Sequence, residues 1–384
     1  MITTAHLCSG YSGIGRGLSL LAPHETLWHA EIDPDMSMIL EKHEPGVLNV
    51  GDLIRLVLDD LWRMAPVPDV LTAGFPCQPV SGAGRQLAEL DPRWLWPFVD
   101  KIIEAVRPPA VFLENVQAIT SIQGGAILRG ILDDLRATRY AARWAIVGAC
   151  AVGAPHHRHR WYLWASRVDS GPVPEAVRVG TKAFCGASRA TGRTLLHSPK
   201  ATDHRGAGTA RMARGEDPWD DLPTDVAMLP TPAARDGGLR GTPSVEHAAR
   251  RAADPMRSLN LEDAIVLLPT PRASDGPNGG PNQRNGRGEY DALPGLVVNA
   301  LPEVWGKYAA AVALWEQVTG NPAPAPTEPN TKGGRRMSAL LPEWMMGLPP
   351  GTLTDHLGRS AAIKAAGNGV VPLQAAAAQR LLTC

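Results

Sequence analysis

The sequence predicts an α/β fold with a mostly parallel sheet, into which a second and less regular region is inserted. Within the first 165 residues, short apolar runs alternate with amphipathic stretches of helical length. The runs lack polar alternation, which is typical of parallel strands that helices cover on both faces. From about residue 169 to 335, periodicity weakens and Pro, Gly and Asp become frequent, before regular patterns return. We therefore expect residues 1–168, completed by 336–384, to form one domain and residues 169–335 another.

The individual elements follow from these runs. The expected strands are residues 4–8, 26–31, 70–73, 110–114 and 161–165. Between them, the helical spacing of apolar residues predicts helices at 14–21, 34–43, 93–106 and 126–136, and later at 339–346 and 371–382. Asp33 directly precedes a proline and is expected to cap the helix at 34–43.

The composition narrows the class of protein. A chain of 384 residues with 44% hydrophobic residues is long enough for two globular domains. No apolar run has the length of a membrane span and the N-terminus lacks a secretory pattern, so we expect a cytoplasmic protein. The five cysteines form no CxxC pair, which predicts neither a metal site nor disulfides. Because 38 basic and 38 acidic residues balance, binding to a polyanion would need a local positive surface.

The irregular region repeats a short turn-like sequence. Residues 229–237 (LPTPAARDG) return as residues 268–276 (LPTPRASDG), and each copy follows a short apolar segment. Proline restricts the backbone and Asp-Gly favours a turn, so we interpret both copies as scaffold loops. Direct contact with a ligand is the alternative interpretation.

Polar and flexible residues follow the first expected strands, where open α/β sheets place ligands. A glycine-rich turn at residues 8–15 follows the first strand, and its backbone could approach a nucleotide-type ligand, although it lacks the GxGxxG spacing of an NAD site. Glu31 ends the second strand and could accept both hydroxyl groups of a ribose. Asp52 follows the third strand and could reach an adenine amino group. A plain tight turn and ordinary helix caps remain the structural alternatives.

A cysteine between two prolines follows the fourth strand, in Gly74-Phe75-Pro76-Cys77-Gln78-Pro79. A thiolate at this place could attack a ring carbon, whereas most lone cysteines are small buried hydrophobes. Glu114 ends the fifth strand after an apolar run, and burial there would raise the pKa of its carboxyl group so that it could act as an acid.

Two arginines, Arg158 and Arg160, stand at alternate positions where the last expected strand begins. Alternate strand residues share a face, so their guanidinium groups could together hold a phosphate or a carbonyl oxygen. The neighbouring histidines have no carboxylate beside them, and we do not interpret them as metal ligands.

The motif around Cys77, together with Glu114-Asn115-Val116, resembles the DNA cytosine-5 methyltransferase family. The resemblance extends over most of the chain, and its motifs occur in the same order as in the family. It includes the glycine turn at residues 10–15, the paired-arginine motif at 155–162, residues 336–349, and the C-terminal motif at 367–372. The chain departs from the family pattern at His6, Cys8, Ser12, His156 and His159.

The resemblance implies a Rossmann-like methyltransferase domain and a catalytic role for four residues. Cys77 would attack carbon 6 of a cytosine flipped out of the duplex. Glu114 would hydrogen-bond the ring nitrogen and amino group, while Arg160, with Arg158, would hold the carbonyl oxygen. Carbon 5 would take a methyl group from S-adenosylmethionine, leaving S-adenosylhomocysteine.

The resemblance also implies which residues bind the cofactor and which partners the chain has. The expected cofactor-binding residues are Cys8, Ser9, Gly10, Gly13, Glu31, Ile32, Asp52, Leu53, Pro76, Asn368 and Val370. The loop at 81–93 would close over the DNA, and residues 169–335 would be the target-recognition domain. We expect a monomer that acts on double-stranded DNA for restriction-modification or protection from restriction, with a cognate restriction endonuclease as a further partner. A non-catalytic DNA-binding relative and an RNA cytosine-5 methyltransferase are the alternatives.

Overall fold

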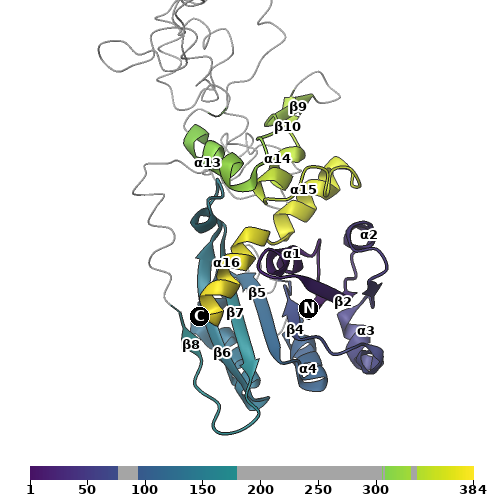
Figure 1. The fold of residues 1–384 in the computed structure, drawn as a ribbon, viewed down its shortest axis with the longest axis vertical. Coiled ribbons are helices and arrows are strands. Elements are labelled where there is room, and N and C mark those ends of the chain that lie inside the picture. The colour runs from purple at the N-terminus through teal and green to yellow at the C-terminus, as the bar shows by residue number, and fades with distance from the viewer. Residues whose placement is uncertain (77–93, 180–304, 306–307, 330–334) are drawn as a thin grey trace, which may run out of the picture.

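A computed structural model of the chain describes residues 1–76, 94–179, 305, 308–329 and 335–384 (Figure 1). Cys77, the loop at 81–93 and most of the region 169–335, including both repeated segments, lie outside the described residues. Within the described part of the chain, no helix is long and apolar enough to cross a membrane.

The centre of the fold is a sheet with the strand order β3-β2-β1-β4-β5-β7-β6-β8. Neighbouring strands from β3 to β5 are parallel, β7 is antiparallel to β5 and β6, and β8 is parallel to β6. The strands are β1 (Ile2–Leu7), β2 (His24–Ala30), β3 (Leu48–Asn49), β4 (Val70–Ala73), β5 (Ala110–Val116), β6 (Tyr140–Gly148), β7 (His159–Arg167) and β8 (Val177–Arg178). The predicted α/β fold with a mostly parallel sheet is therefore confirmed.

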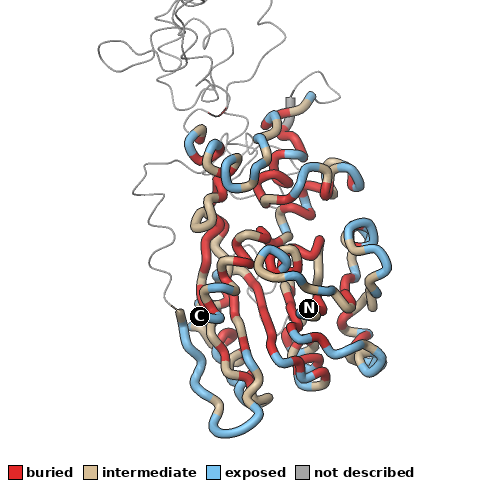
Figure 2. The backbone as a smooth tube through the Cα atoms, in the orientation of Figure 1, coloured by how far each residue is buried: buried red, intermediate tan, exposed pale blue. Residues whose placement is uncertain are grey.

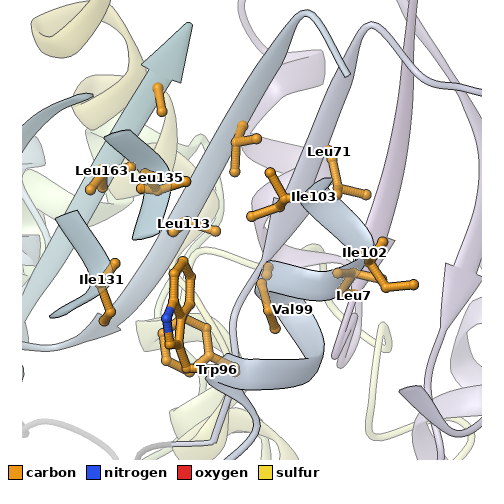
Figure 3. Packing of buried hydrophobic residues seen from close by; sticks show 14 of the residues in the cluster. Leu7, Leu71, Trp96, Val99, Ile102, Ile103, Leu113, Ile131, Leu135 and Leu163 are labelled. Atoms are coloured by element: carbon orange, nitrogen blue, oxygen red, sulfur yellow. The ribbon is translucent and has the colours of Figure 1, made fainter. Parts of the chain in front are cut away.

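Helices cover both faces of the sheet, as the apolar strands require. One face packs against α1 (Gly13–Ser19) and α16 (Pro372–Thr383). The other packs against α3 (Leu53–Leu58), α4 (Trp96–Val106) and α5 (Ala126–Ala137). Figure 3 shows this second face, where Val99, Ile102 and Ile103 of α4 lie against strand residues such as Leu71 and Leu113. Buried residues accordingly concentrate along the strands and the inner sides of the helices (Figure 2).

A smaller group of elements packs beyond the carboxyl ends of the parallel strands (Figure 1). It consists of α13 (Ala309–Thr319), the hairpin of β9 (Thr327–Pro329) and β10 (Arg335–Met337), α14 (Leu340–Met345) and α15 (Arg359–Asn368). Two tryptophans link these elements, because Trp315 Nε1 donates to the Trp344 carbonyl at 2.9 Å and Trp344 Nε1 donates to the Asn321 carbonyl at 3.0 Å. From this group the chain returns through α15 to α16 on the main sheet.

Some described residues of the expected second domain pack with the first. β8 pairs with β6, and α13 shares an apolar cluster with α14 and α15. The division at residues 168 and 336 remains a prediction, because residues 180–304 are outside the described part.

Candidate active site

A pocket of about 320 Å³ opens at the carboxyl ends of the central strands. Its walls come from the segments that follow β1, β2, β3 and β4, from the end of β5 and from the start of β7. One side of α15 forms a further wall, with residues at helical i, i+3, i+4 and i+7 spacing: Ala361, Lys364, Ala365 and Asn368. The volume is within the range of small-molecule sites.

Most of the expected cofactor residues lie in these walls. They are Cys8, Gly10, Glu31, Ile32, Asp52, Leu53, Pro76 and Asn368. Ser9, Gly13 and Val370 are not among the lining residues. Ser9 Oγ donates to the His6 carbonyl at 2.7 Å, and a Cβ atom on Gly13 would lie 2.6 Å from the Val370 carbonyl oxygen. Ser9 therefore contacts the end of β1, and Gly13 packs against Val370.

The turn after β1 depends on left-handed backbone conformations. Cys8, Gly10 and Ser12 have φ values of 51°, 53° and 61°, a region that costs non-glycine residues free energy. A Cβ atom on Gly10 would meet nothing within 4 Å, so the backbone there faces open space beside the pocket. Burial, followed by the nearby carboxylates of Glu31 and Asp52, raises the pKa of the Cys8 thiol to about 12, and this thiol stays neutral.

Two backbone amides hold the Glu31 side chain in place. Its Oε2 accepts from Gly10 N at 2.7 Å and its Oε1 accepts from Asp33 N at 2.8 Å. Burial raises the pKa of this carboxyl group, whereas both hydrogen bonds oppose the shift. Asp33 caps α2 (Pro34–His43) as predicted, because its side chain accepts from the amides of Asp35 and Met36. Asp52 likewise accepts from Ile54 N at 2.9 Å, so this pocket residue is also a helix cap.

Glu114 and Arg160 form an ion pair in the wall at the β5 end. Glu114 lies opposite Tyr162 and Arg160 lies opposite Val116 in the antiparallel register, so the two side chains meet diagonally on one face. Arg160 Nε is 3.0 Å from Glu114 Oε1, and Glu114 is 7% exposed. Burial raises the pKa of the Glu114 carboxyl group as predicted, while the charges of Arg160 and Arg158 oppose that shift.

Arg158 departs from the predicted arrangement. β7 begins only at His159, and Arg158 has a φ of 27°, so strand alternation does not apply to it. It is not among the pocket-lining residues. Its Nη2 instead donates to the carbonyls of Gly367 and Gly369 in the C-terminal segment. The two arginines therefore point to different partners.

The first described segment ends at Pro76, one residue before Cys77. Pro76 lines the pocket, and the preceding Phe75 packs against Trp94 and Trp96 with ring centroids 5.9 Å away in both cases. Asn115 Nδ2 donates to the Phe75 carbonyl at 3.1 Å. This bond fixes the segment leading to Cys77 beside the end of β5, next to Glu114.

Sequence reasoning missed Tyr11 and the histidines behind the glycine turn. Tyr11 lines the pocket, and its hydroxyl donates to the Val370 carbonyl at 2.8 Å. His6 stacks on His29 with ring centroids 5.3 Å apart, and its Nδ1 lies 2.7 Å from Thr72 Oγ1. Burial, followed by the charge of His29, lowers the pKa of His6 to about 3, so a neutral imidazole stands behind the turn. Only the polar character of Tyr11 and His6 within apolar surroundings could have indicated these roles.

Comparison with known proteins supports the same family. The family model described as C-5 cytosine-specific DNA methylase matches residues 2–198, half of the chain. The chain is 32% identical over 173 residues to the type II methyltransferase M.NgoBV of Neisseria gonorrhoeae, covering 42% of this chain and 40% of that protein. It is 33% identical over 159 residues to the type II methyltransferase M.DsaV of Dactylococcopsis salina, covering 40% and 43%. The aligned region thus spans about two fifths of these relatives.

A likeness of fold extends over the whole chain. A crystal structure of a DNMT2 from Spodoptera frugiperda aligns with all of both chains at a TM-score of 0.51 and 14% sequence identity. At that identity the match supports the fold alone. The family match, the strand order and the pocket at the strand ends together show that this chain belongs to the C-5 cytosine-specific DNA methylase family.

Proposed function

We propose that the chain transfers a methyl group from S-adenosylmethionine to carbon 5 of a cytosine in a specific duplex DNA sequence. The observation that carries this proposal is the buried Glu114–Arg160 pair, which lies in the same pocket as Glu31 and next to the segment that leads to Cys77. A carboxyl group and a guanidinium group side by side offer the hydrogen bonds that a cytosine edge requires.

The pocket residues fit S-adenosylmethionine. Glu31 directly follows β2 and keeps lone pairs for ribose hydroxyl groups, while Asp52 is placed to accept from an adenine amino group. Aliphatic walls from Ile32, Leu53 and Pro76 suit a flat base. The several carboxylates in the walls also suit a ligand with a sulfonium and an ammonium charge. When bound, this cofactor would supply the electrophilic methyl group.

The protein's own residues would perform the remaining chemistry. The Cys77 thiolate attacks carbon 6 of the flipped-out cytosine, so a sulfur–carbon bond forms and electron density moves toward carbon 5. Glu114, whose pKa is raised by burial, donates a hydrogen bond to the ring nitrogen and stabilises this density. Arg160 orients Glu114 and binds the carbonyl oxygen. After carbon 5 is methylated, loss of its proton restores the double bond and releases Cys77.

A role in restriction-modification is supported by the names of the relatives, which are type II methyltransferases. Double-stranded DNA would be the substrate, read by the region 169–335, and a cognate restriction endonuclease would be the partner. We also propose that the protein is a cytoplasmic monomer, as expected from the sequence. An RNA cytosine-5 methyltransferase and a non-catalytic DNA-binding protein are the competing functions.

Bisulfite sequencing of a host that lacks cytosine methylation tests the proposal directly. The chain and its Cys77→Ser variant are expressed separately, and the host DNA is converted and sequenced. We expect protected cytosines in one short motif with the unaltered chain and none with the variant. Absence of protection in both samples would count against DNA methylation.

A covalent-trapping experiment separates the competing functions. DNA containing 5-fluorocytosine cannot lose a proton from carbon 5, so a Cys77-dependent adduct should accumulate in the presence of S-adenosylmethionine. DNA binding without an adduct would favour the non-catalytic protein, and an adduct only with 5-fluorocytosine RNA would favour the RNA enzyme.

A further inference from the structure

The C-terminal segment at 367–374 forms part of the pocket wall although it comes from the far end of the sequence. Asn368 and Gly369 line the pocket, at the end of α15 and just beyond it. A Cβ atom on Gly369 would collide with the Tyr11 ring, so the segment fits tightly over the turn after β1. Such a wall keeps its position only if its backbone is anchored.

Arg158 supplies anchors on both sides of Asn368. Its Nη2 donates to the carbonyls of Gly367, at 3.0 Å, and Gly369. Arg158 is 5% exposed, and although burial and then the charge of Arg160 lower its pKa to about 10, the guanidinium group stays charged at neutral pH. Hydrogen bonds from a charged donor are stronger than neutral ones and are costly to lose when buried.

The backbone of Arg158 is tied to the same segment. Gln374, at the start of α16, is fully buried, and its Nε2 donates to the carbonyls of Arg158 and Val147, both at 2.8 Å. Both the side chain and the main chain of Arg158 thus form hydrogen bonds with residues of the segment 367–374. Arg160, two residues later, contacts Glu114 in the pocket instead.

We propose that Arg158 is a positioning residue that holds the Asn368 wall of the cofactor site, whereas Arg160, which contacts Glu114, serves the cytosine. This inference rests on the proposed function and revises the shared role that alternation in the sequence predicts. It assigns two separate tasks to arginines that are two positions apart: loss of Arg158 should weaken cofactor binding, and loss of Arg160 should weaken attack on the base.

Two measurements separate these tasks. Affinity for S-adenosylhomocysteine, measured by isothermal titration calorimetry, reports on the cofactor wall. Attack by Cys77 is measured without cofactor, as release of tritium from carbon 5 of labelled cytosine in DNA from an unmethylated host. In that exchange, the sulfur bonds to carbon 6 and carbon 5 takes a proton from water, and reversal then releases either hydrogen isotope.

The test compares Arg158→Lys with Arg160→Lys. We expect Arg158→Lys to weaken S-adenosylhomocysteine binding by about 10-fold or more, as loss of a charged hydrogen bond implies, while tritium release falls far less. Arg160→Lys should show the opposite pattern. Arg129→Lys is the matched control, because Arg129 also donates to a main-chain carbonyl, that of Gly124 at 3.0 Å, but is exposed and does not line the pocket.

Gln374→Met provides an independent variant should Arg158→Lys fail to fold, and it should also reduce cofactor affinity more than tritium release. The inference is overturned if either variant, while retaining the native melting transition, loses tritium release as much as cofactor affinity, or leaves cofactor affinity unchanged. If the unaltered chain neither binds S-adenosylhomocysteine nor releases tritium, the proposed function itself fails.

Discussion

At the scale of single residues, burial raises the pKa of several groups in the pocket walls. Glu114 is a carboxyl group with a raised pKa beside a guanidinium group, and Cys8 is a thiol kept neutral among carboxylates. The sequence predicted Glu114 because its carboxyl group closes an apolar run, where burial raises the pKa. It did not predict the separate orientation of Arg158, because a φ of 27° breaks the alternation on which the prediction relied.

Glu114→Gln tests the residue scale. Glutamine keeps the shape of the side chain, and its amide group can still donate a hydrogen bond, but it has no acidic proton to transfer. We therefore expect methyl transfer to fall by about 100-fold or more. Affinity for S-adenosylhomocysteine should change far less than turnover, because the ribose and adenine contacts proposed for the cofactor come from Glu31 and Asp52 and not from Glu114. Radiolabelled methyl transfer to DNA, with calorimetry on the same sample, measures both. Unchanged turnover would remove Glu114 from the mechanism.

At the scale of elements, the close contact of α1 with α16 joins the two ends of the sequence. Gly17 permits this contact, because a Cβ atom there would lie 2.6 Å from the Pro372 carbonyl oxygen and 2.9 Å from Ala375 Cβ. Both helices were predicted approximately, as was most of the sheet, since apolar runs mark buried strands. β6 was missed although residues 144–147 (WAIV) form an apolar run, because the first part of the strand mixes buried and half-buried residues and contains Arg143, unlike a strand that helices cover on both faces.

Gly17→Ala and Gly130→Ala form a matched pair at the element scale. The first should destabilise the fold by about 1–3 kcal/mol, because the added methyl group overpacks the helix contact. The second should stabilise it by about 0.5–1 kcal/mol, because Gly130 lies within α5, where an added Cβ atom would meet nothing within 4 Å and alanine favours a helix. Denaturant unfolding of both variants measures these changes, and equal effects would contradict the assigned packing.

At the scale of the whole molecule, buried neutral histidines link stability to pH. Burial lowers the pKa of His6 to about 3 behind the glycine turn, and burial also lowers the pKa of His156 to about 3, where Nε2 donates to the Met345 carbonyl. These two residues join the sheet to the glycine turn and to α14. Neither contact could be predicted from the sequence, because each joins segments whose packing the local pattern does not encode.

Acid should therefore destabilise the protein in a defined window. In the unfolded chain a histidine takes up a proton near pH 6.5, whereas His6 and His156 resist protonation in the fold until about pH 3. Their contribution is complete above pH 6.5 and is lost progressively as the pH falls below it. Urea unfolding between pH 8 and pH 4.5 should show this decline, and His156→Gln should make it shallower. A stability that rises on acidification would contradict the assigned burial.

The return of α15 and α16 to the first domain also bears on synthesis. Translation proceeds from the N-terminus, and roughly 290 residues separate Gly74 from Asn368 in the pocket, so at usual elongation rates about 15–60 s pass between their appearance. Throughout that interval, the nascent chain can form most of the sheet but not the wall that Asn368 contributes. Ribosome-bound chains should accordingly lack a complete pocket until residue 368 has been synthesised.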